Sequence, residues 1–182
     1  ALVVTATTKG PGVWLVAAGE IHHSQFVQKV HPTRLNAFDS GETGAAGSVQ
    51  NDKVQWLANF PNPLPNLRMD VSHLPMAAQW PWVEIVMNHV NANHQHVDAL
   101  VNAGVQGLVI AGTGNGSVSS KMKESLVRAQ IAKIQIRLSS RCNQGAVIPT
   151  SSHVFEARSA LSPAKTRVAM LLDIISERQS SA

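Results

Sequence analysis

Three glycines, Gly112, Gly114 and Gly116, come directly after the apolar run of residues 108–111 and lead toward a stretch with a helical pattern. Backbone N–H groups of a loop at a helix N-terminus attract anions, so a phosphate cradle is the first chemistry to consider. The spacing does not fit one. The dinucleotide fingerprint needs G-x-G-x-x-G with an acidic residue about 20 positions later, and the P-loop needs a Lys-Ser/Thr pair after its last glycine. The pattern therefore favours a tight turn in which glycines supply positive φ.

Histidines raise the possibility of a metal site, because the chain has eight of them and His89, His94 and His96 lie close together. On a helix, His94 and His96 are two positions apart and point to different faces. Neither a Cys pair nor an H-E-x-x-H motif stands nearby to complete a coordination sphere. The sequence therefore predicts solvent-facing histidines, no metal site and no cofactor.

Hydrolytic chemistry lacks a complete set of residues in this sequence. A serine hydrolase needs an exposed nucleophile such as that of G-x-S-x-G with a positioned base, and the motif is absent. Ser139 and Ser140 are instead expected to end a strand. Paired carboxylates for acid–base catalysis are also hard to assemble from those in the second half of the chain, which are Glu84, Asp98, Glu124, Glu156, Asp173 and Glu177. The residues by themselves predict no catalytic constellation.

The elements that would position these residues are clearest in the second half of the chain. Apolar runs typical of strands lie at residues 83–87, 108–111 and 134–138. Asn93 can cap a helix after the first run, Gly104 can end it, and a second helix is expected at about residues 121–131. This alternation predicts an α/β fold of right-handed βαβ units, with an open parallel sheet and flanking helices.

The carboxyl ends of parallel strands lie at one edge of a sheet and form the usual binding crevice. We expect residues 88–91, 112–116 and 139–141 to line this edge. A last helix should begin near Pro163, an allowed first-turn residue, and its apolar spacing predicts that it covers one face of the sheet.

The first half of the chain is less regular. Residues 13–17 form a continuous apolar run between glycines, typical of a strand buried on both faces. The following stretch is rich in Gly, Asn and Pro, with one plausible hairpin at residues 47–56 around a polar Asn-Asp turn. We expect residues 1–40 to be a remnant of a preceding α/β domain that ends in its last strand. Residues 41–78 should be a linker with the hairpin, and residues 79–182 a second α/β domain.

Composition excludes several classes of protein. No apolar run approaches the roughly 18 to 20 residues of a membrane-spanning helix. The net charge of +4 is spread along 182 residues without a run of like charges, and the chain has no Tyr, four Phe and four Trp, which argues against a nucleic-acid partner. The single Cys142 cannot form an internal disulfide.

Residues 103–116 read AGVQGLVIAGTGNG, residues 139–141 read SSR, and residues 161–167 read LSPAKTR. These strings resemble the A-G-x-x-G-[IL]-V-x-A-G-x-G-N-G segment, the R-S-S-R strand end and the L-N-P-x-K-A-R helix start of the bacterial-type L-asparaginases and glutaminase-asparaginases. Weaker matches to the family's N-D-x-I, K-T-x-T-T-R, F-x-S and G-P-L-G strings run from Glu20 to Gly47. The resemblance holds nearly end to end.

The resemblance implies hydrolysis of the side-chain amide of L-Asn, or of L-Gln, to the acid and ammonia. It also implies that the chain covers the last strand of the family's N-terminal domain, the linker and the whole C-terminal domain. The family's T-G-G-T nucleophile motif and T-D-T/K catalytic set belong to the half that is missing, and neither string occurs here. No catalytic residue is therefore expected in this chain, which should be inactive alone. It begins in mid-pattern, as a fragment would.

In the family, four identical chains assemble from intimate dimers, and the C-terminal domain of a neighbour lends polar side chains to each active site. The resemblance assigns the donated substrate-binding residue to Asn91, while Asn88 and Asn93 are competitors and a capping or turn role for Asn91 stays open. An Asn just past a strand end offers both a donor and an acceptor to an amino acid. The family's donated Glu has no counterpart, since the loop after residue 141 contains no acid and Glu156 aligns with a position that is normally apolar.

An alternative of a different class stays open, namely a non-catalytic α/β module that assembles or binds a small amino acid. An upstream T-G-G-T in the same gene product would favour the enzyme, and a Met directly before Ala1 would favour the module. The upstream pattern resembles the exported branch of the family, which implies a periplasmic or secreted protein, with the cytoplasm as the alternative. The expected partners are L-Asn or L-Gln and further copies of the chain, without nucleic acid or membrane.

Overall fold

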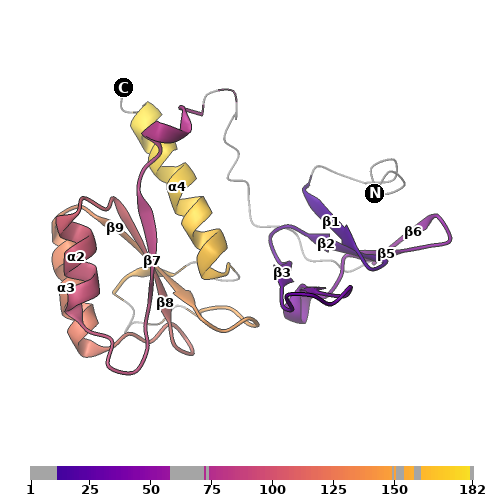
Figure 1. Cartoon of the computed structure of the whole chain (residues 1–182), viewed down its shortest axis with the longest axis horizontal. Helices are drawn as coiled ribbons and strands as arrows, with labels where there is room; N and C mark the ends of the chain where they lie inside the picture. The colour runs from indigo at the N-terminus through magenta and orange to yellow at the C-terminus, as the bar shows by residue number, and fades with distance from the viewer. Residues whose placement is uncertain are drawn as a thin grey trace. The chain divides into compact units, whose positions relative to one another are not determined.

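The computed structural model describes residues 12–57, 72, 74–148, 150, 154–157 and 161–180. The chain divides into two compact units, Ala1–Pro65 and Asn66–Ala182. In Figure 1 the first unit runs from indigo to purple, and the second from magenta to yellow. None of the described helices is long and apolar enough to cross a membrane.

The second unit is built on a parallel sheet. Its strands lie in the order β10-β9-β8-β7 and all neighbours are parallel. The strands are β7 (Val83–Met87), β8 (Gly107–Gly112), β9 (Gln135–Ser140) and β10 (Glu156–Ala157). This confirms the predicted α/β fold with an open parallel sheet, and β10 is a strand that the sequence did not predict.

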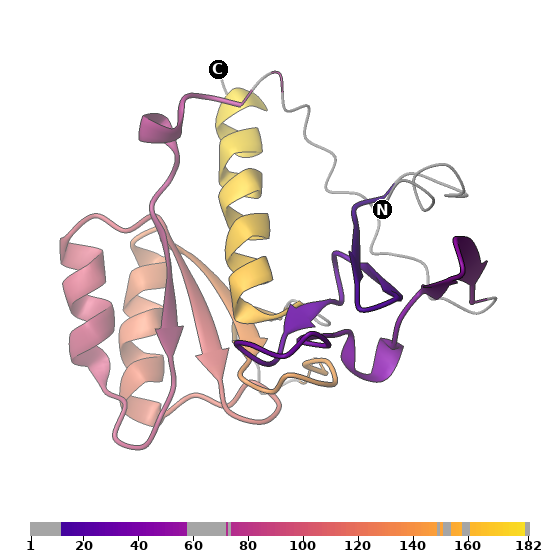
Figure 2. The same ribbon diagram turned by 45° about the vertical axis from the view of Figure 1, so that its right-hand side comes forward.

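Helices cover both faces of this sheet. The helices are α2 (His94–Asn102), α3 (Ser120–Ile131) and α4 (Pro163–Ser180), preceded by the short 3-10 helix η3 (Ala77–Gln79). The crossover helices α2 and α3 lie on one face, and α4 lies on the other (Figures 1 and 2). The predicted covering role of the last helix is therefore confirmed.

The ends of the helices follow from local chemistry. The Asn93 side chain accepts a hydrogen bond from the backbone N–H of Gln95 at 3.0 Å, and so caps α2 as predicted. After α2, Gly104 takes a φ of 90°, a left-handed conformation that ends a helix. The Ser119 side chain caps α3 by accepting from the N–H of Met122.

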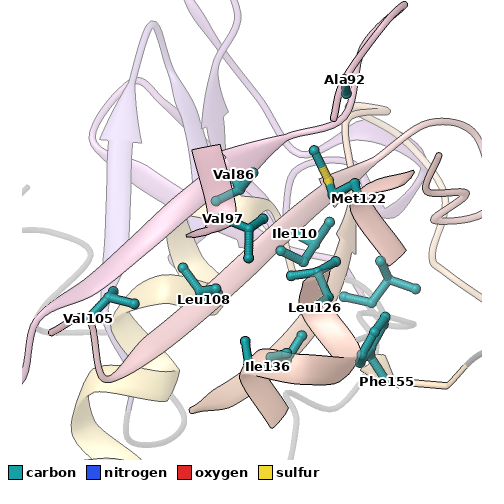
Figure 3. Packing of buried hydrophobic residues seen from close by; sticks show 12 residues of the cluster. Val86, Ala92, Val97, Val105, Leu108, Ile110, Met122, Leu126, Ile136 and Phe155 are labelled. Atoms are coloured by element: carbon teal, nitrogen blue, oxygen red, sulfur yellow. The ribbon is translucent and has the colours of Figure 1, made fainter. Parts of the chain in front are cut away.

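Two apolar clusters hold the layers together. Figure 3 shows the larger one, in which Leu108 and Ile110 of β8 meet α2 and α3, with Leu126 of α3 among the fully buried side chains. Val109, between them in sequence, points to the opposite face and packs in the α4 cluster with Met170. Since both faces of β8 are buried, its sequence is a continuous apolar run. Each such Leu or Ile contributes about 1.5 to 3 kcal/mol by burial.

One charged pair lies beneath α4. Arg137 of β9 is buried, and its Nη1 lies 2.7 Å from Oδ2 of Asp173 on α4. Nearby, Nε of Arg167 donates to the carbonyl oxygen of Val83 at 2.7 Å. The pair joins the helix to the sheet at a position where an apolar residue would be expected.

The first unit has a different architecture. Its main sheet is antiparallel, in the order β1-β2-β5-β6. The elements are β1 (Trp14–Ala17), β2 (Glu20–His23), β3 (Gln28–Lys29), β4 (Phe38–Asp39), the 3-10 helix η1 (Gly41–Thr43), β5 (Gly47–Gln50) and β6 (Lys53–Trp56). The strands β3 and β4 form a separate antiparallel pair.

Burial of residues 13–17 on both faces is a wrong prediction. The strand forms, but it is the edge strand β1 of an antiparallel sheet, and all of its residues are half-buried. The apolar run arises because Leu15 lies on the opposite face from Trp14 and Val16, and neither face is fully covered. A short apolar run alone does not distinguish these two cases.

The expected hairpin is present as β5 and β6, and it pairs with β2 within the first unit. Its turn residues Asn51 and Asp52 have φ of 47° and 58°, which fits a two-residue turn with both central residues left-handed. The functional division at residues 1–40, 41–78 and 79–182 remains a prediction, and its boundaries differ from those of the two compact units.

Candidate functional site

The three segments predicted to share an edge do meet at the carboxyl ends of β7, β8 and β9. Asn88, directly after β7, is buried and joins all three. Its Nδ2 donates to the Ser117 carbonyl at 3.1 Å, and its Oδ1 accepts from the N–H of Ser119 at 3.2 Å. Its own carbonyl accepts from Nη1 of Arg141 at 2.6 Å. Asn88 therefore positions the edge, and its burial leaves its amide little access to a ligand.

The segment after β8 is a closed turn, as predicted. Thr113 and Ser117 pair across it, and Gly114 and Gly116 have φ of 52° and 81°. A Cβ on Gly112 would lie 2.5 Å from the carbonyl carbon of Gly116, so the turn closes too tightly for any side chain there. Because the turn bonds to itself and Ser119 already caps α3, the geometry does not form a phosphate cradle.

The end of β9 ties this turn down. Oγ of Ser140 donates to the Gly114 carbonyl at 2.6 Å, and the N–H of Arg141 donates to the Gly112 carbonyl at 2.9 Å. Ser139 is fully buried, and its Oγ donates to the Leu161 carbonyl before α4. Both serines lie at the end of β9, as the sequence predicts.

Asn91 lies on the same edge and differs from the two competing asparagines. Asn93 caps α2, and Asn88 is buried and bonded, whereas Asn91 is exposed. The side chain of Asn91 makes no hydrogen bond to any described residue, and its backbone has a φ of 64°. A left-handed Asn is compatible with a turn role. The amide is nevertheless the one among the three that a ligand could reach.

Two further residues of this edge are Ser117, which the sequence did not single out, and Arg141, which it placed on the edge without a chemical role. Ser117 follows the last glycine of the turn and is exposed, and its hydroxyl lies within reach of solvent. The only sequence signal for Ser117 is its place directly after the last glycine of the turn. Arg141 follows a strand end directly, which is a position typical of site residues.

A cavity of about 200 Å³ opens beside the turn. Its lining residues are Gly116, Ser117, Val118, Lys123, Leu138, Val154 and Phe155. Four apolar side chains line it together with one hydroxyl and one ammonium group. A small molecule bound in this cavity would meet both polar groups.

Lys165 lies in the first turn of α4. The helix starts beside the end of β9, since the Leu161 carbonyl accepts from the hydroxyls of both Ser139 and Thr166. Partial burial lowers the pKa of the Lys165 ammonium to about 8. A part of the population is therefore neutral at mildly alkaline pH.

The histidines of the edge do not form a metal site. His89, His94 and His96 are exposed, as predicted. Nδ1 of His94 donates to Oδ2 of Asp98 at 2.8 Å, one turn along α2. Among the residues that the structure describes, no three His, Cys, Asp or Glu side chains gather closely enough to hold a metal ion.

The first unit contains a chain of hydrogen bonds with the residue types of a hydrolase triad. Nδ1 of His22 lies 2.9 Å from Oγ of Ser40, and Nε2 lies 3.3 Å from a carboxylate oxygen of Glu20. A carboxylate only accepts, so the neutral ring carries its proton on Nε2 and accepts from Ser40 at Nδ1. Ser40 is only 5% exposed, which leaves little access for a substrate. The chain of bonds satisfies two buried polar groups and is not a candidate active site.

Comparison with known sequences gives two family matches. A model described as "Glutaminase/Asparaginase C-terminal domain" matches residues 82–176, and one described as "Asparaginase, N-terminal" matches residues 1–62.

Individual relatives are also similar to this chain. The "Probable L-asparaginase periplasmic" of Haemophilus influenzae is 32% identical, over 94% of this chain and 51% of its own length. The "L-asparaginase 2" of Escherichia coli is 31% identical, over 93% and 51%, and the "Glutaminase-asparaginase" of Pseudomonas fluorescens is 30% identical, over 94% and 48%. The chain thus spans about half the length of these relatives.

Proposed function

Because the chain belongs to the bacterial-type asparaginase and glutaminase-asparaginase family, we propose that it is part of an amidohydrolase that converts L-Asn, with L-Gln as the candidate second substrate, to the acid and ammonia. The observation that carries this proposal is the match to both domain models in chain order, residues 1–62 and then 82–176. The carboxyl edge of the parallel sheet, where Asn91 is exposed, supports it.

The proposed chemistry needs a nucleophile from outside this sequence. In the reaction that the resemblance implies, a Thr hydroxyl attacks the amide carbon, the C–N bond breaks and ammonia leaves, and water then hydrolyses the acyl-enzyme. The family's Thr motifs do not occur in these 182 residues. The 182 residues alone should therefore release no ammonia.

The role of this chain is then to bind and orient. We assign Asn91 to the substrate, because a primary amide can accept from the α-ammonium group and donate to the α-carboxylate. Ser117 is the structural competitor, since it is exposed on the same edge and can also do both. We further propose that the chain assembles as a homotetramer of intimate dimers and donates Asn91 to the active site of a neighbouring subunit. The proposed location is the periplasm or the outside of the cell, with the cytoplasm as the alternative. No cofactor, nucleic acid or membrane partner is required.

The first experiment is the intact mass of the native gene product, with ammonia release from L-Asn and L-Gln on the same sample. A mass near twice 19.5 kDa with ammonia released would support the proposal. The alternative, a non-catalytic binding module, is worth testing because the Thr motifs do not occur in this sequence. It would be favoured by a product of 19.5 kDa that binds L-Asn in calorimetry but releases no ammonia.

The second experiment tests the site in the ammonia-releasing form. Asn91→Ala should lower kcat/KM by about tenfold or more, because two hydrogen bonds to a charged ligand are lost. Asn102→Ala is the matched control, since Asn102 is exposed at the far end of α2. Unchanged kinetics in Asn91→Ala with a loss in Ser117→Ala would transfer the binding role to the turn after β8.

A further inference from the structure

The cavity beside the turn after β8 has two polar side chains whose polar ends contact no described residue. Ser117 is fixed through its backbone, since its carbonyl accepts from Asn88 and its N–H donates to the Thr113 carbonyl, but its hydroxyl makes no hydrogen bond to a described residue. The ammonium group of Lys123, on α3, forms no ion pair or hydrogen bond with a described residue. Both side chains line the cavity, so both can donate to a bound molecule.

The charge on the cavity wall is positive. None of the described residues that line the cavity carries a carboxylate, so no acid of the wall balances the charge of Lys123. On α3, the residues three and four positions from Lys123 are Ser119, Ser120, Leu126 and Val127, and none of them is acidic. A cation without a nearby carboxylate favours an anionic ligand.

The remaining wall of the cavity is apolar. Leu138 of β9 and Phe155 are buried, and Figure 3 shows Phe155 in the larger apolar cluster. A Cβ on Gly116 would lie 2.8 Å from Cδ2 of Leu138, and Gly116 has a φ of 81°, so no other residue type fits the turn at this wall. A ligand in the cavity would therefore have an apolar part as well as a charge.

The size of the cavity limits the ligand further. At roughly 30 Å³ for a water-sized group, about 200 Å³ holds about six or seven non-hydrogen atoms. Inorganic phosphate is disfavoured, because the backbone N–H groups of Ser117 and Met122 are already bonded within the turn and the helix cap. A free amino acid is disfavoured too, because its ammonium group would lie beside Lys123 and find no carboxylate among the lining residues.

We propose that this cavity binds a small aliphatic monocarboxylate of about four or five carbons. Its carboxylate accepts from the ammonium group of Lys123 and from the hydroxyl of Ser117, and its alkyl chain packs against Leu138 and Phe155. Such a ligand has neither the α-ammonium group nor the side-chain amide of L-Asn. The inference therefore goes beyond the proposed function and does not rest on it.

The test is a calorimetric titration of the native gene product with sodium butyrate, at constant ionic strength. We expect saturable binding below about 10 mM, which is attainable for a ligand of this size. Acetate should bind about tenfold more weakly, because two methylene groups are lost from the apolar contact. L-2-aminobutyrate, which adds only an ammonium group to butyrate, should also bind at least tenfold more weakly. Butyrate that does not saturate, or equal binding of butyrate and L-2-aminobutyrate, would overturn the inference.

The cation is tested by a pair of lysines on the same helix. Lys123→Met should weaken butyrate binding at least tenfold, because a charge-assisted hydrogen bond is lost. Lys121→Met is the matched control, since Lys121 is exposed in the first turn of α3 and does not line the cavity, and it should change the affinity less than twofold. Equal losses in the two variants would mean that butyrate responds only to the net charge, which would overturn the inference.

The apolar wall is tested from the solvent side, where folding is least affected. Val154 lines the cavity and is half-exposed, so Val154→Asp adds a carboxylate without removing a core residue, and it should weaken butyrate binding at least tenfold by charge repulsion. Ile148→Asp is the matched control, because Ile148 is also exposed but does not line the cavity. Urea denaturation verifies that each variant is folded. Unchanged binding in folded Val154→Asp would place the ligand elsewhere and overturn the inference.

Discussion

In the second unit, α2 and α3 cover one face of the parallel sheet and α4 covers the other, so that Leu108, Val109 and Ile110 are all fully buried. In the first unit, an antiparallel sheet of similar strand length leaves Val16, Val49 and Val54 half-buried. The apolar residues of the two sheets are alike in type. What differs is whether the described part of the chain provides a second layer.

This difference indicates a division of roles. The second unit has a packed core and a defined edge, where the buried Asn88 holds the backbone at Ser117 and Asn91 is exposed. The first unit has an apolar sheet face that its described residues cover only in part. We therefore expect core substitutions to be costly in the second unit and mild in the first, and the predictions below run from the largest expected effect to the smallest.

The largest effect is expected at the buried ion pair. Asp173→Leu leaves Arg137 buried without its carboxylate, which should lower the free energy of unfolding of the second unit by about 3 to 5 kcal/mol. Urea denaturation measures it. The double variant Arg137→Met with Asp173→Leu removes both charges and should recover most of the loss. If Asp173→Leu alone costs less than about 1 kcal/mol, water solvates Arg137. The sheet beneath α4 would then be less fully buried than the comparison of the two units requires.

The next effect compares the two cores directly. Leu126→Ala in α3 should cost about 2 to 5 kcal/mol, because Leu126 is fully buried and a cavity remains. Val54→Ala should cost about 1 kcal/mol or less, since its side chain already contacts solvent. Hydrogen exchange resolves the two units separately. Equal costs at the two positions would contradict the comparison and require a covered face on the first sheet.

The second unit could be predicted from its sequence because its signals are local. Asn93 and Gly104 mark the ends of α2, and the apolar run of β8 is long enough to require burial on both faces. The residues of the binding edge could also be predicted, because the topology of a parallel sheet places the carboxyl ends of its strands together. The apolar run at Trp14–Ala17 was misjudged, since four apolar residues fit both a buried strand and a half-covered edge strand.

Other features depend on contacts between distant residues. Arg137 lies within an apolar strand pattern, and its ion pair with Asp173 on α4 is a contact that residue spacing does not reveal. The strand β10 has two residues and is defined by pairing with β9. The roles of Asn88 and Ser117 depend on hydrogen bonds across the edge, which residue spacing does not encode.

A smaller effect concerns Lys165, which is half-buried in the first turn of α4. Burial holds its pKa at about 8 in the folded chain, below the ordinary 10.5, so the folded state carries a penalty whenever the amine is charged. The penalty is present below pH 8 and disappears as pH rises toward 10.5, where the amine is neutral in both states. Stability should therefore rise across this window.

Lys165→Met should stabilise the second unit at pH 7 by about 1 kcal/mol or less, allowing for solvent screening of a half-exposed group. The gain should shrink when urea denaturation is repeated above pH 10. Lys121→Met is the matched control, because Lys121 is exposed in the first turn of α3. Equal gains from both substitutions would point to the helix dipole rather than to burial.

The smallest effect on the free energy of unfolding is expected on the solvent side of α2. Exposed charges should contribute little to stability even in the better-packed second unit. Hydrogen bonds from His94 and, to a lesser degree, from Arg128 hold the pKa of the Asp98 carboxyl below its usual 3.8. The contribution to stability is therefore present above pH 3.8 and is lost as pH falls through the lower folded value. Asp98→Asn should cost about 0.5 kcal/mol at pH 7, and less in 1 M salt, because all three side chains are exposed. Glu124→Gln, an exposed acid on α3 without an ion pair to a described residue, should cost nothing measurable. A cost above about 2 kcal/mol that does not depend on salt would contradict this prediction. It would mean that the ion pair of Asp98 is buried in solution, as when a neighbouring chain covers the outer surface of α2.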